Sequence, residues 1–407
     1  MRILVTCDRY PGLPLDGLTL RIYHYAKYLS ARHELDLVCL GDDTEAYPEI
    51  ESCFRQVRRF PKPERSAPPT NRLGWLAAGL NPGTLCLRSP EAQAYIEEAV
   101  ADGGYDLIWD AGCNMLFNLV AARRNLPLLA DQVDDSFLRL TRDIRLAPTP
   151  YAKLWSMKQM LLSWMFAFQH LRKAGAVLFV SQADADSFKR FMPFANSVVV
   201  ENGVDEAYFR PDATSTPDHD SAVPEIVFEG SMFFTPNIDA ARYFVETVFP
   251  LIRQALPDAR FTIVGRNPSN EVKALAGNGV VVTGSVPDVR PYLQRAGVFV
   301  CPMRSGAGIK NKILQAWAMG KAIVSTTEGV GSLKVSDGQN ILIRNTPRAF
   351  ADAVVGLLRE PDKATQLGDA GRSTIESHYT WTAKARELEI LMEQIVQKHA
   401  ASNRGRS

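Results

Sequence analysis

The stretch CPMRSGAGIKNKILQAWAMGKAIVST, residues 301–326, decides the fold. It predicts the end of a buried strand at Cys301, a loop of small residues, a helix that begins near Ile309 and a new strand over 321–327. Glycines in the loop allow the backbone to approach a ligand closely, and the following helix N-terminus offers free N–H groups with a positive dipole end. Strand–loop–helix units of this kind build doubly wound α/β sheets.

Short apolar runs recur along the rest of the chain, separated by segments with helical periodicity. Continuous apolar runs of this length are typical of strands buried on both faces of a parallel sheet. The sequence therefore predicts two tandem doubly wound Rossmann-like α/β domains with a cleft between them, at the carboxyl ends of their strands. The predicted strands are 2–7, 34–40, 105–111, 127–133, 176–181 and 197–204, then 225–231, 260–266, 280–286, 297–302, 321–327 and 340–345.

Changes in composition indicate the domain boundaries. A Pro-containing stretch without periodicity reads as a linker, and the last helical pattern places Leu388, Leu391 and Ile395 on one stripe. The expected parts are a first domain (1–205), a linker (206–223), a second domain (224–376), a C-terminal helix (377–398) that returns to the first domain, and a disordered tail (399–407).

Composition and charge exclude several classes of protein. The 407 residues carry 46 Lys and Arg against 45 Asp and Glu, and 46% are apolar, which is typical of a folded globular protein and not of a nucleic-acid binder. The 6 cysteines form no CxxC motif and no cluster with histidines, so we expect reduced, buried thiols and no metal site. The N-terminal apolar run is short and no segment has about 20 uninterrupted apolar residues, so we expect a cytoplasmic protein.

Two lysines stand in the first turn of the helix predicted after the small-residue loop. Cations are unfavourable at a helix N-terminus, and an anion bound between Lys310 and Lys312 would remove that conflict. At about 100° per residue, Asn311, Lys312 and Gln315 share one polar face. An ordinary strand–loop–helix unit with solvated lysines is the alternative interpretation.

Other predicted strand ends of the second domain carry similar residues. Gly230 and Ser231 follow one strand, with Asn237 as a candidate helix cap, and Arg266 and Asp288 follow two more. All of them fall on the same edge of the predicted sheet. Backbone donors, cations and a neutral shelf for a base are what a nucleoside diphosphate site requires, whereas plain strand–helix turns are the alternative.

A resemblance to a known family emerges from the motifs ENGVDEAYFRP, FEGSMFFTPNIDAARYF, FTIVGRNPS, VTGSVPDVRPYL, GAGIKNKILQAWAMGKAIVST and HYTW. In this order they cover most of 197–398, and they resemble the retaining glycosyltransferases with the GT-B fold, group 1 and family 4-like. The similarity is greatest to bacterial sugar transferases of polysaccharide assembly. The first half is similar more loosely, through its opening strand and the segment DGLTLRIYHYAKYLS.

This resemblance implies a donor side and an acceptor side. The second domain would bind a nucleotide-sugar donor, and the first would bind a glycan or lipid-linked acceptor whose hydroxyl receives the sugar. Lys312 would be catalytic by stabilising the leaving diphosphate, and no cofactor or metal is implied. The expected donor-binding residues are Gly17, Gly230, Ser231, Arg266, Val286, Asp288, Gly308, Lys310, Lys312 and Gln315.

The chain departs from the family at its characteristic pair of glutamates. They map onto Ala307 and Gln315, so both carboxylates are missing. An amide can still hydrogen-bond a ribose hydroxyl, without charge assistance. Two alternatives therefore stay open: a non-catalytic relative that binds nucleotide sugars, and a nucleotide-sugar epimerase.

The first domain also places polar residues at predicted strand ends. By resemblance, Gly12, Asp16 and Gly17 lie in the loop that approaches the donor phosphates, although turn formation explains them equally. The segment ADQVDDS (130–136) places three aspartates at the end of a strand. Asp134 is the candidate catalytic carboxylate, and capping of the next helix is the alternative role for this group.

The segment 151–173 is basic and rich in Trp, Met and Phe, and no acidic residue occurs between Asp143 and Asp184. A helix of this composition can lie at a membrane surface. Burial between the sheet and the cleft is the alternative. We therefore count a peripheral contact with the inner face of a membrane among the expected partners, and no nucleic acid.

Overall fold

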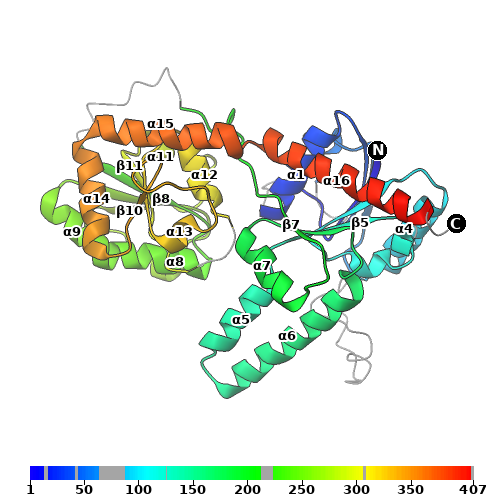
Figure 1. Cartoon of the computed structure of the whole chain (residues 1–407). Coiled ribbons are helices and arrows are strands. Elements are labelled where there is room, and N and C mark those ends of the chain that lie inside the picture. The colour runs from blue at the N-terminus through cyan, green and yellow to red at the C-terminus, as the bar shows by residue number, and fades with distance from the viewer. Residues whose placement is uncertain are drawn as a thin grey trace. The chain divides into compact units, whose positions relative to one another are not determined.

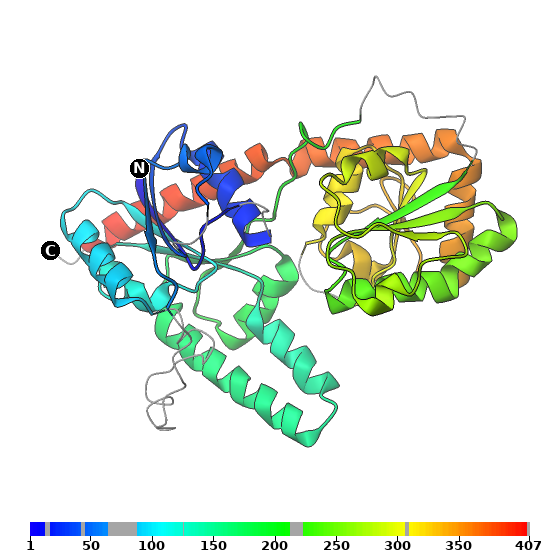
Figure 2. The same ribbon diagram turned by 180° about the vertical axis from the view of Figure 1, so that it is seen from behind.

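The computed structural model describes residues 1–12, 17–41, 45–63, 88–124, 126–211, 223–305 and 309–404. They form two compact units, which we call unit 1 (Met1–Glu201 with Lys384–Ser407) and unit 2 (Asn202–Ala383). Each unit contains one parallel sheet with helices on both of its faces (Figures 1 and 2). The predicted fold class, two doubly wound α/β domains and a C-terminal helix, is confirmed.

The sheet of unit 1 has the order β3-β2-β1-β4-β5-β6-β7, with every described pairing parallel. Its central strands are apolar and buried along nearly their whole length, as their composition predicts. The sequence did not predict β3, whose side chains are half-buried or exposed because it is an edge strand. The strands are β1 (Arg2–Cys7), β2 (Glu34–Leu40), β3 (Gln56–Phe60), β4 (Leu107–Ala111), β5 (Leu128–Val133), β6 (Ala176–Phe179) and β7 (Ser197–Val199).

Helices cover both faces of this sheet, with α1 and α16 on one side and α4 and α7 on the other (Figures 1 and 2). The helices are α1 (Gly17–Leu29), α2 (Pro48–Glu51), α4 (Pro90–Ala101), α5 (Ser136–Leu146), α6 (Pro150–His170), α7 (Gln182–Phe191) and α16 (Trp381–Arg404), with 3₁₀ turns η2 (Leu116–Leu119) and η3 (Ala122–Arg124).

Helix α16 joins the two ends of the chain within unit 1. The predicted stripe of Leu388, Leu391 and Ile395 is buried, and the Glu389 carboxylate accepts hydrogen bonds from Arg32 (3.0 Å) and His33 (2.8 Å) at the end of α1. The prediction of a disordered tail from residue 399 was wrong as far as residue 404, because α16 continues to Arg404. Ala400 and Ala401, which favour helix, lie in this extension.

The sheet of unit 2 has the order β10-β9-β8-β11-β12-β13, again parallel throughout its described strands. Its strands are β8 (Glu225–Glu229), β9 (Arg260–Val264), β10 (Val280–Val282), β11 (Val298–Cys301), β12 (Ile323–Ser325) and β13 (Leu342–Ile343). Its helices are α8 (Thr235–Tyr243), η4 (Phe244–Val248, a π-helix), α9 (Phe249–Ala255), α10 (Asn270–Lys273), α11 (Arg290–Arg295), α12 (Asn311–Ala318), α13 (Thr327–Val330), α14 (Pro347–Arg359) and α15 (Pro361–His378).

Close packing against α15 fixes the position of α12, the helix predicted from 301–326. Trp317 is fully buried and its indole N–H donates to the Asn340 carbonyl at 2.8 Å. A Cβ on Gly371 would lie 2.1 Å from the Trp317 ring, so only glycine permits this approach. The polar face of α12 is thereby turned away from the core.

The described cysteines Cys7, Cys39, Cys53, Cys113 and Cys301 are buried and unpaired, as predicted. The sixth, Cys86, lies outside the described residues. Among the helices that the structure describes, none is both long and apolar enough to cross a membrane.

Candidate functional site

The topology of unit 2 defines where a ligand is expected. From β8 the chain moves outward to β9 and β10, and it then returns to β11 on the other side of β8. In doubly wound sheets, ligands bind outside the carboxyl ends of the strands at this point of reversal. Gly230 and Ser231 follow β8 there, and the loop after β11 leads to Lys310 and Lys312.

Three residues that are distant in the sequence meet at this point. The Lys312 ammonium donates a hydrogen bond to the Asn237 side-chain oxygen at 2.8 Å, and the Asn237 amide donates to the Ser231 carbonyl at 3.0 Å. A Cβ on Gly230 would lie 2.8 Å from the Lys312 Nζ atom. Asn237 was predicted as a helix cap. This role is wrong, because Phe234 is the residue that precedes α8 and Asn237 lies inside the helix.

The surroundings of Lys312 favour an external anion. Its ammonium lies 4.4 Å from the centre of the Phe228 ring, and burial lowers its pKa from the usual value. Among the described residues, no carboxylate forms an ion pair with Lys312. Glu229 is buried nearby, and desolvation raises the pKa of its carboxyl while the charge of Lys312 lowers it. A partly dehydrated ammonium without an ion pair is suited to bind phosphate.

A second close approach brings the turns after β8 and β9 together. A Cβ on Gly265 would lie 1.7 Å from the Gly230 carbonyl oxygen, so the turns after β8 and β9 touch through their backbones. The Gly230 N–H donates to the Val264 carbonyl at 3.0 Å, which fixes this contact. Arg266 follows directly and is exposed. The predicted residues Gly230, Ser231 and Arg266 therefore share one edge with Lys312.

The other predicted donor residues lie on the same carboxyl side of the sheet. Val286 packs against the core and is half-buried. Asp288 forms an ion pair with Arg290 at 2.7 Å, and this hydrogen bonding lowers the pKa of its carboxyl. Lys310 is buried and directly precedes α12. Gln315 is half-buried on α12.

One predicted residue of this edge, Gly308, lies outside the described residues, as does Ala307. Among the described residues, no group of three or more His, Cys, Asp and Glu side chains is placed to hold a metal ion.

In unit 1, the aspartates at the carboxyl end of β5 and just after it have separate roles. Asp131 is buried in an ion pair with Arg21 at 2.9 Å, and Asp135 caps α5 by accepting from the N–H groups of Phe137 and Leu138. Capping therefore explains one of the three, as the alternative interpretation had it. Asp134 is exposed, so its carboxylate is the one in this group that solvent reaches.

Two more residues of unit 1 follow or end a strand at the carboxyl edge of its sheet, at β1 and β4. Gly17 is the first residue of α1, and a Cβ there would meet nothing within 4 Å, while Asp16 lies outside the described residues. Asp110 at the end of β4 accepts a hydrogen bond from Thr6 at 2.7 Å, and burial raises the pKa of its carboxyl to about 7. Asp110 could not be predicted as a functional residue from the sequence, because a single Asp in a predicted strand forms no motif.

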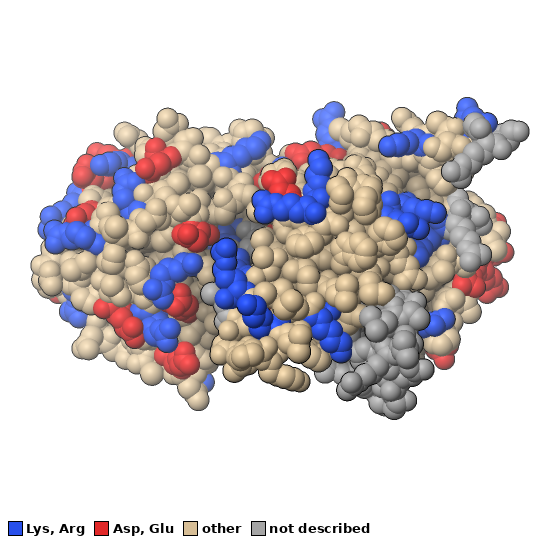
Figure 3. Space-filling model, turned by 60° about the horizontal axis from the view of Figure 1, so that its bottom comes forward, with Lys and Arg blue, Asp and Glu red and all other residues tan. Residues whose placement is uncertain are grey.

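Helix α6 contains most of the basic, aromatic segment predicted at 151–173. Its buried residues, Leu162, Ser163, Phe166, Ala167 and His170, all lie in its second half. In its first half Tyr151, Leu154 and Trp155 are 76%, 67% and 50% exposed. The burial interpretation therefore fails for this first half. Figure 3 brings the end of unit 1 with α5 and α6 forward and shows uncharged surface there beside blue Lys and Arg atoms.

Comparisons with known proteins agree with this architecture. The family model described as Glycosyltransferase Family 4 matches residues 15–208, and the model described as Glycosyl transferases group 1 matches residues 223–360. A GDP-mannose-dependent alpha-(1-6)-phosphatidylinositol monomannoside mannosyltransferase of Mycobacterium tuberculosis is 26% identical over 337 residues, 76% of this chain and 81% of that protein. An uncharacterized 44.6 kDa protein of the Klebsiella pneumoniae cps region is 24% identical over 164 residues, 38% of this chain and 42% of that protein.

Solved structures show the same fold. A sucrose-phosphate synthase from Thermosynechococcus elongatus superposes with a TM-score of 0.70 at 17% identity, covering 98% of this chain and 100% of that one. HepE of Anabaena, in complex with UDP and glucose, superposes with a TM-score of 0.64 at 14% identity, covering 96% and 99%. The chain therefore belongs to the glycosyltransferases of group 1 and family 4, with the two-domain GT-B fold.

Proposed function

We propose that this glycosyltransferase takes its sugar from a nucleotide-sugar donor and transfers it, with retention of configuration, to a hydroxyl of a glycan or lipid-linked saccharide in the biosynthesis of a cell-surface polysaccharide. The observation that supports the donor most strongly is Lys312. It is a half-buried ammonium without a described ion pair, at the carboxyl edge of β8 and β11 and beside Gly230.

The residues at this edge suit the chemistry of a departing nucleoside diphosphate. Negative charge grows on the diphosphate as the bond to the sugar breaks, and a preorganised cation with backbone donors stabilises that charge. Asn237 holds the Lys312 ammonium at 2.8 Å and so preorganises it. Arg266 adds a second cation, and Gln315 would bind the ribose through its amide. No cofactor or metal forms part of this proposal.

Similar proteins indicate which donors to test first. The mycobacterial relative is named as GDP-mannose-dependent, and HepE was solved with UDP. The first experiment is therefore a thermal-shift series with UDP, GDP, ADP and CMP. A ligand that binds only the folded state at 100 times its dissociation constant adds about 2.7 kcal/mol of stability. We expect one nucleotide to raise the melting temperature, whereas no shift with any of them at millimolar concentration would overturn the donor site.

Turnover distinguishes the two alternatives from the transferase. Incubation with UDP- and GDP-sugars separates them: release of nucleoside diphosphate indicates transfer or hydrolysis, a changed sugar on an intact donor indicates an epimerase, and binding without either indicates a non-catalytic relative. The carboxylate that the family has at the position of Gln315 is absent here, so the transferase has to be tested against both alternatives.

The acceptor side of the proposal includes a membrane surface on α6. Exposed Leu154 and Trp155 lie beside Lys158, whose ammonium is 5.2 Å from the Trp155 ring. Apolar and aromatic side chains next to cations bind the interface of an anionic membrane. Such a contact would bring the enzyme to a lipid-linked acceptor, and the relative named above has phosphatidylinositol monomannoside in its name.

Vesicle sedimentation tests this surface. The wild-type protein should sediment with vesicles of phosphatidylglycerol, and the Leu154→Ser/Trp155→Ser variant should remain in the supernatant. A matched control changes two apolar side chains exposed elsewhere, Val281→Ser/Ile390→Ser, which are 41% and 47% exposed. Equal sedimentation of the wild type and both variants would contradict the α6 surface.

A further inference from the structure

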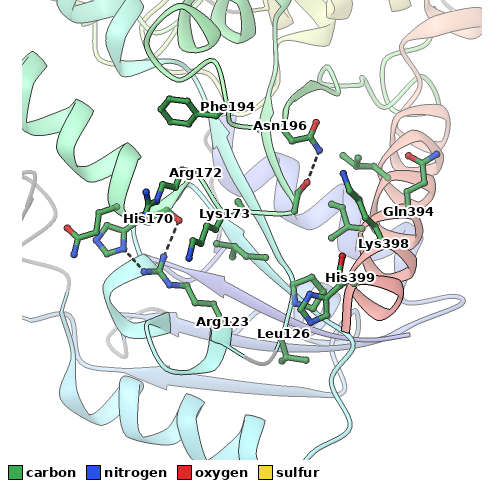
Figure 4. Close-up of a pocket in the computed structure, with 18 of the residues that line it drawn as sticks. Arg123, Leu126, His170, Arg172, Lys173, Phe194, Asn196, Gln394, Lys398 and His399 are labelled. Atoms are coloured by element: carbon green, nitrogen blue, oxygen red, sulfur yellow. Dashed lines mark hydrogen bonds between the residues drawn. The ribbon is translucent and has the colours of Figure 1, made fainter. Parts of the chain in front are cut away.

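A groove with a volume of about 860 Å³ lies within unit 1, away from the edge described above. Its lining includes Pro127 and Leu128 at the start of β5, Gly175 just before β6 and Asn196 just before β7. All parallel strands of a sheet begin at the same edge. The groove therefore lies at the amino edge, opposite the carboxyl ends where substrates of doubly wound enzymes bind. Its far wall is α16 (Figure 4).

The charges around this groove have one sign. Arg123, Arg172 and Lys173 line one side, and Lys398 of α16 lines the other (Figure 4). None of the described lining residues is Asp or Glu. A concave surface lined by one sign of charge concentrates counter-ions. The overall formal charge of the chain is only +1, so this collection of cations is local.

Arg123 is the residue of the groove that points most strongly to an anionic ligand. Its guanidinium is half-buried and donates to the His170 carbonyl at 3.1 Å and to His170 Nδ1 at 2.8 Å. The first acceptor is an uncharged backbone carbonyl. The second is a neutral imidazole, because burial and the neighbouring guanidinium lower the pKa of His170 to about 4. Burial likewise lowers the pKa of Arg123 from its usual value. Among the described residues, no carboxylate forms an ion pair with it.

The negative ends of neighbouring helices offset only part of this positive charge. The C-terminus of α6 is at His170, beside Arg123 and Arg172, and a helix C-terminus carries roughly half a negative elementary charge. The end of α16 is more than one turn beyond Lys398, and the effect falls off within the last turn. Even if both ends acted in full, they would offset about one of the four cations.

We propose that this groove is a second binding site, for a phosphate-bearing ligand. The phosphate oxygens accept from Arg123, Arg172, Lys173 and Lys398, and the side-chain amide of Gln394 is available beside them. The walls between the cations are apolar, formed by Val120, Leu126, Leu391 and Ile395 with Phe194. They suit an organic group attached to the phosphate, and the volume is within the range of small-molecule sites.

Two sources of such a phosphate are distinguished by experiment. Calorimetric titration with pyrophosphate measures a free ligand, and sedimentation with phosphatidic acid in phosphatidylcholine vesicles measures a lipid headgroup. Both are carried out with excess UDP or GDP, whichever nucleotide the thermal-shift series selects, so that the edge at Lys312 is filled. The variant is Lys173→Gln/Lys398→Gln, whose side chains are exposed and whose loss spares the core. Lys27→Gln/Lys189→Gln, exposed and outside the groove, is the control with the same change of charge.

We expect one of the two probes to bind the wild type, to bind the groove variant at least about 10-fold more weakly, and to bind the control variant unchanged. Pyrophosphate binding would identify a free phosphorylated ligand, and vesicle binding lost in the groove variant would identify a lipid phosphate. Failure of pyrophosphate to bind, together with vesicle binding that is absent or is equal in the wild type and the groove variant, would overturn the site, because α6 alone would account for equal vesicle binding. Equal weakening of probe binding in the groove and control variants would also overturn the site, because the weakening would then follow from the lower net charge of the protein and not from the groove.

Discussion

Replacing Lys312 by methionine removes the charge at the donor edge and keeps the length of the side chain. Met retains the apolar contact with Phe228, so the change isolates the ammonium. A charge-assisted hydrogen bond to phosphate contributes about 1.5–3 kcal/mol. Affinity for the nucleoside diphosphate should therefore fall about 10- to 100-fold.

The stability of the variant should change little. The hydrogen bond from Lys312 to Asn237 at 2.8 Å is lost, which costs about 1 kcal/mol. The ammonium is partly dehydrated, as its lowered pKa indicates, so removing it offsets part of that cost. We expect the melting temperature to change by no more than about 4 °C.

Calorimetric titration with UDP and GDP measures the loss, and a second lysine provides the control. Lys321 donates to the carbonyls of Gln294 at 2.7 Å and Ala296 at 3.2 Å, and it stands at the amino end of β12, on the opposite edge of the sheet. Lys321→Met should lower stability and leave nucleotide affinity unchanged. A folded Lys312→Met protein with wild-type nucleotide affinity would refute the assignment of the phosphate site.

Three further outcomes are expected. Gly265→Ala should lower the melting temperature by roughly 5–10 °C in a thermal scan, because its Cβ would lie 1.7 Å from a backbone oxygen. Gly230→Ala, whose Cβ would meet side-chain atoms of Lys312 and Asn237 at 2.8 Å, should be destabilised less and should lose nucleotide affinity in a titration. A stable Gly265→Ala protein would contradict the close approach. Gln315→Glu should preserve or improve nucleotide affinity, and Gln315→Ala should weaken it by less than Lys312→Met does. A titration in which the alanine variant binds the nucleotide more tightly than the wild type would exclude the amide from the ribose site. The pKa of Asp110 is about 7 in the folded protein and near 3.8 ordinarily, so the free energy of unfolding should fall as the pH rises from about 4 to 7. In urea unfolding, Asp110→Asn should therefore gain stability relative to the wild type across that interval. A difference in stability that does not change with pH would show that the carboxyl does not titrate there.

The sequence predicted the elements that carry strong local patterns. Apolar runs located β1, β2 and β8 to within a few residues, and helical spacing identified the polar face of α12, which presents Lys312 and Gln315. The edge strand β3 escaped prediction because charged residues interrupt its apolar pattern. In such an edge strand, the alternation of apolar and polar residues is too weak to identify the strand from the sequence.

Contacts between distant segments could not be predicted in the same way. The hydrogen bond between Lys312 and Asn237 joins residues 75 positions apart, and it converts an expected helix cap into a support for the ammonium. The phosphate groove combines residues 123, 172 and 398, which share no sequence motif. They come together only because α16 returns to unit 1. The elevated pKa of Asp110 depends on burial, which the sequence does not report.

The central claim is that the donor is a nucleotide sugar whose diphosphate binds beside Lys312. The most direct test is the release of nucleoside diphosphate from a panel of UDP- and GDP-sugars by the wild type and by Lys312→Met, with a lipid-linked saccharide fraction as the acceptor. The wild type should release UDP or GDP from at least one donor, and the variant should do so about 10- to 100-fold more slowly. Equal release by the two proteins, or no release from any donor, would contradict the claim.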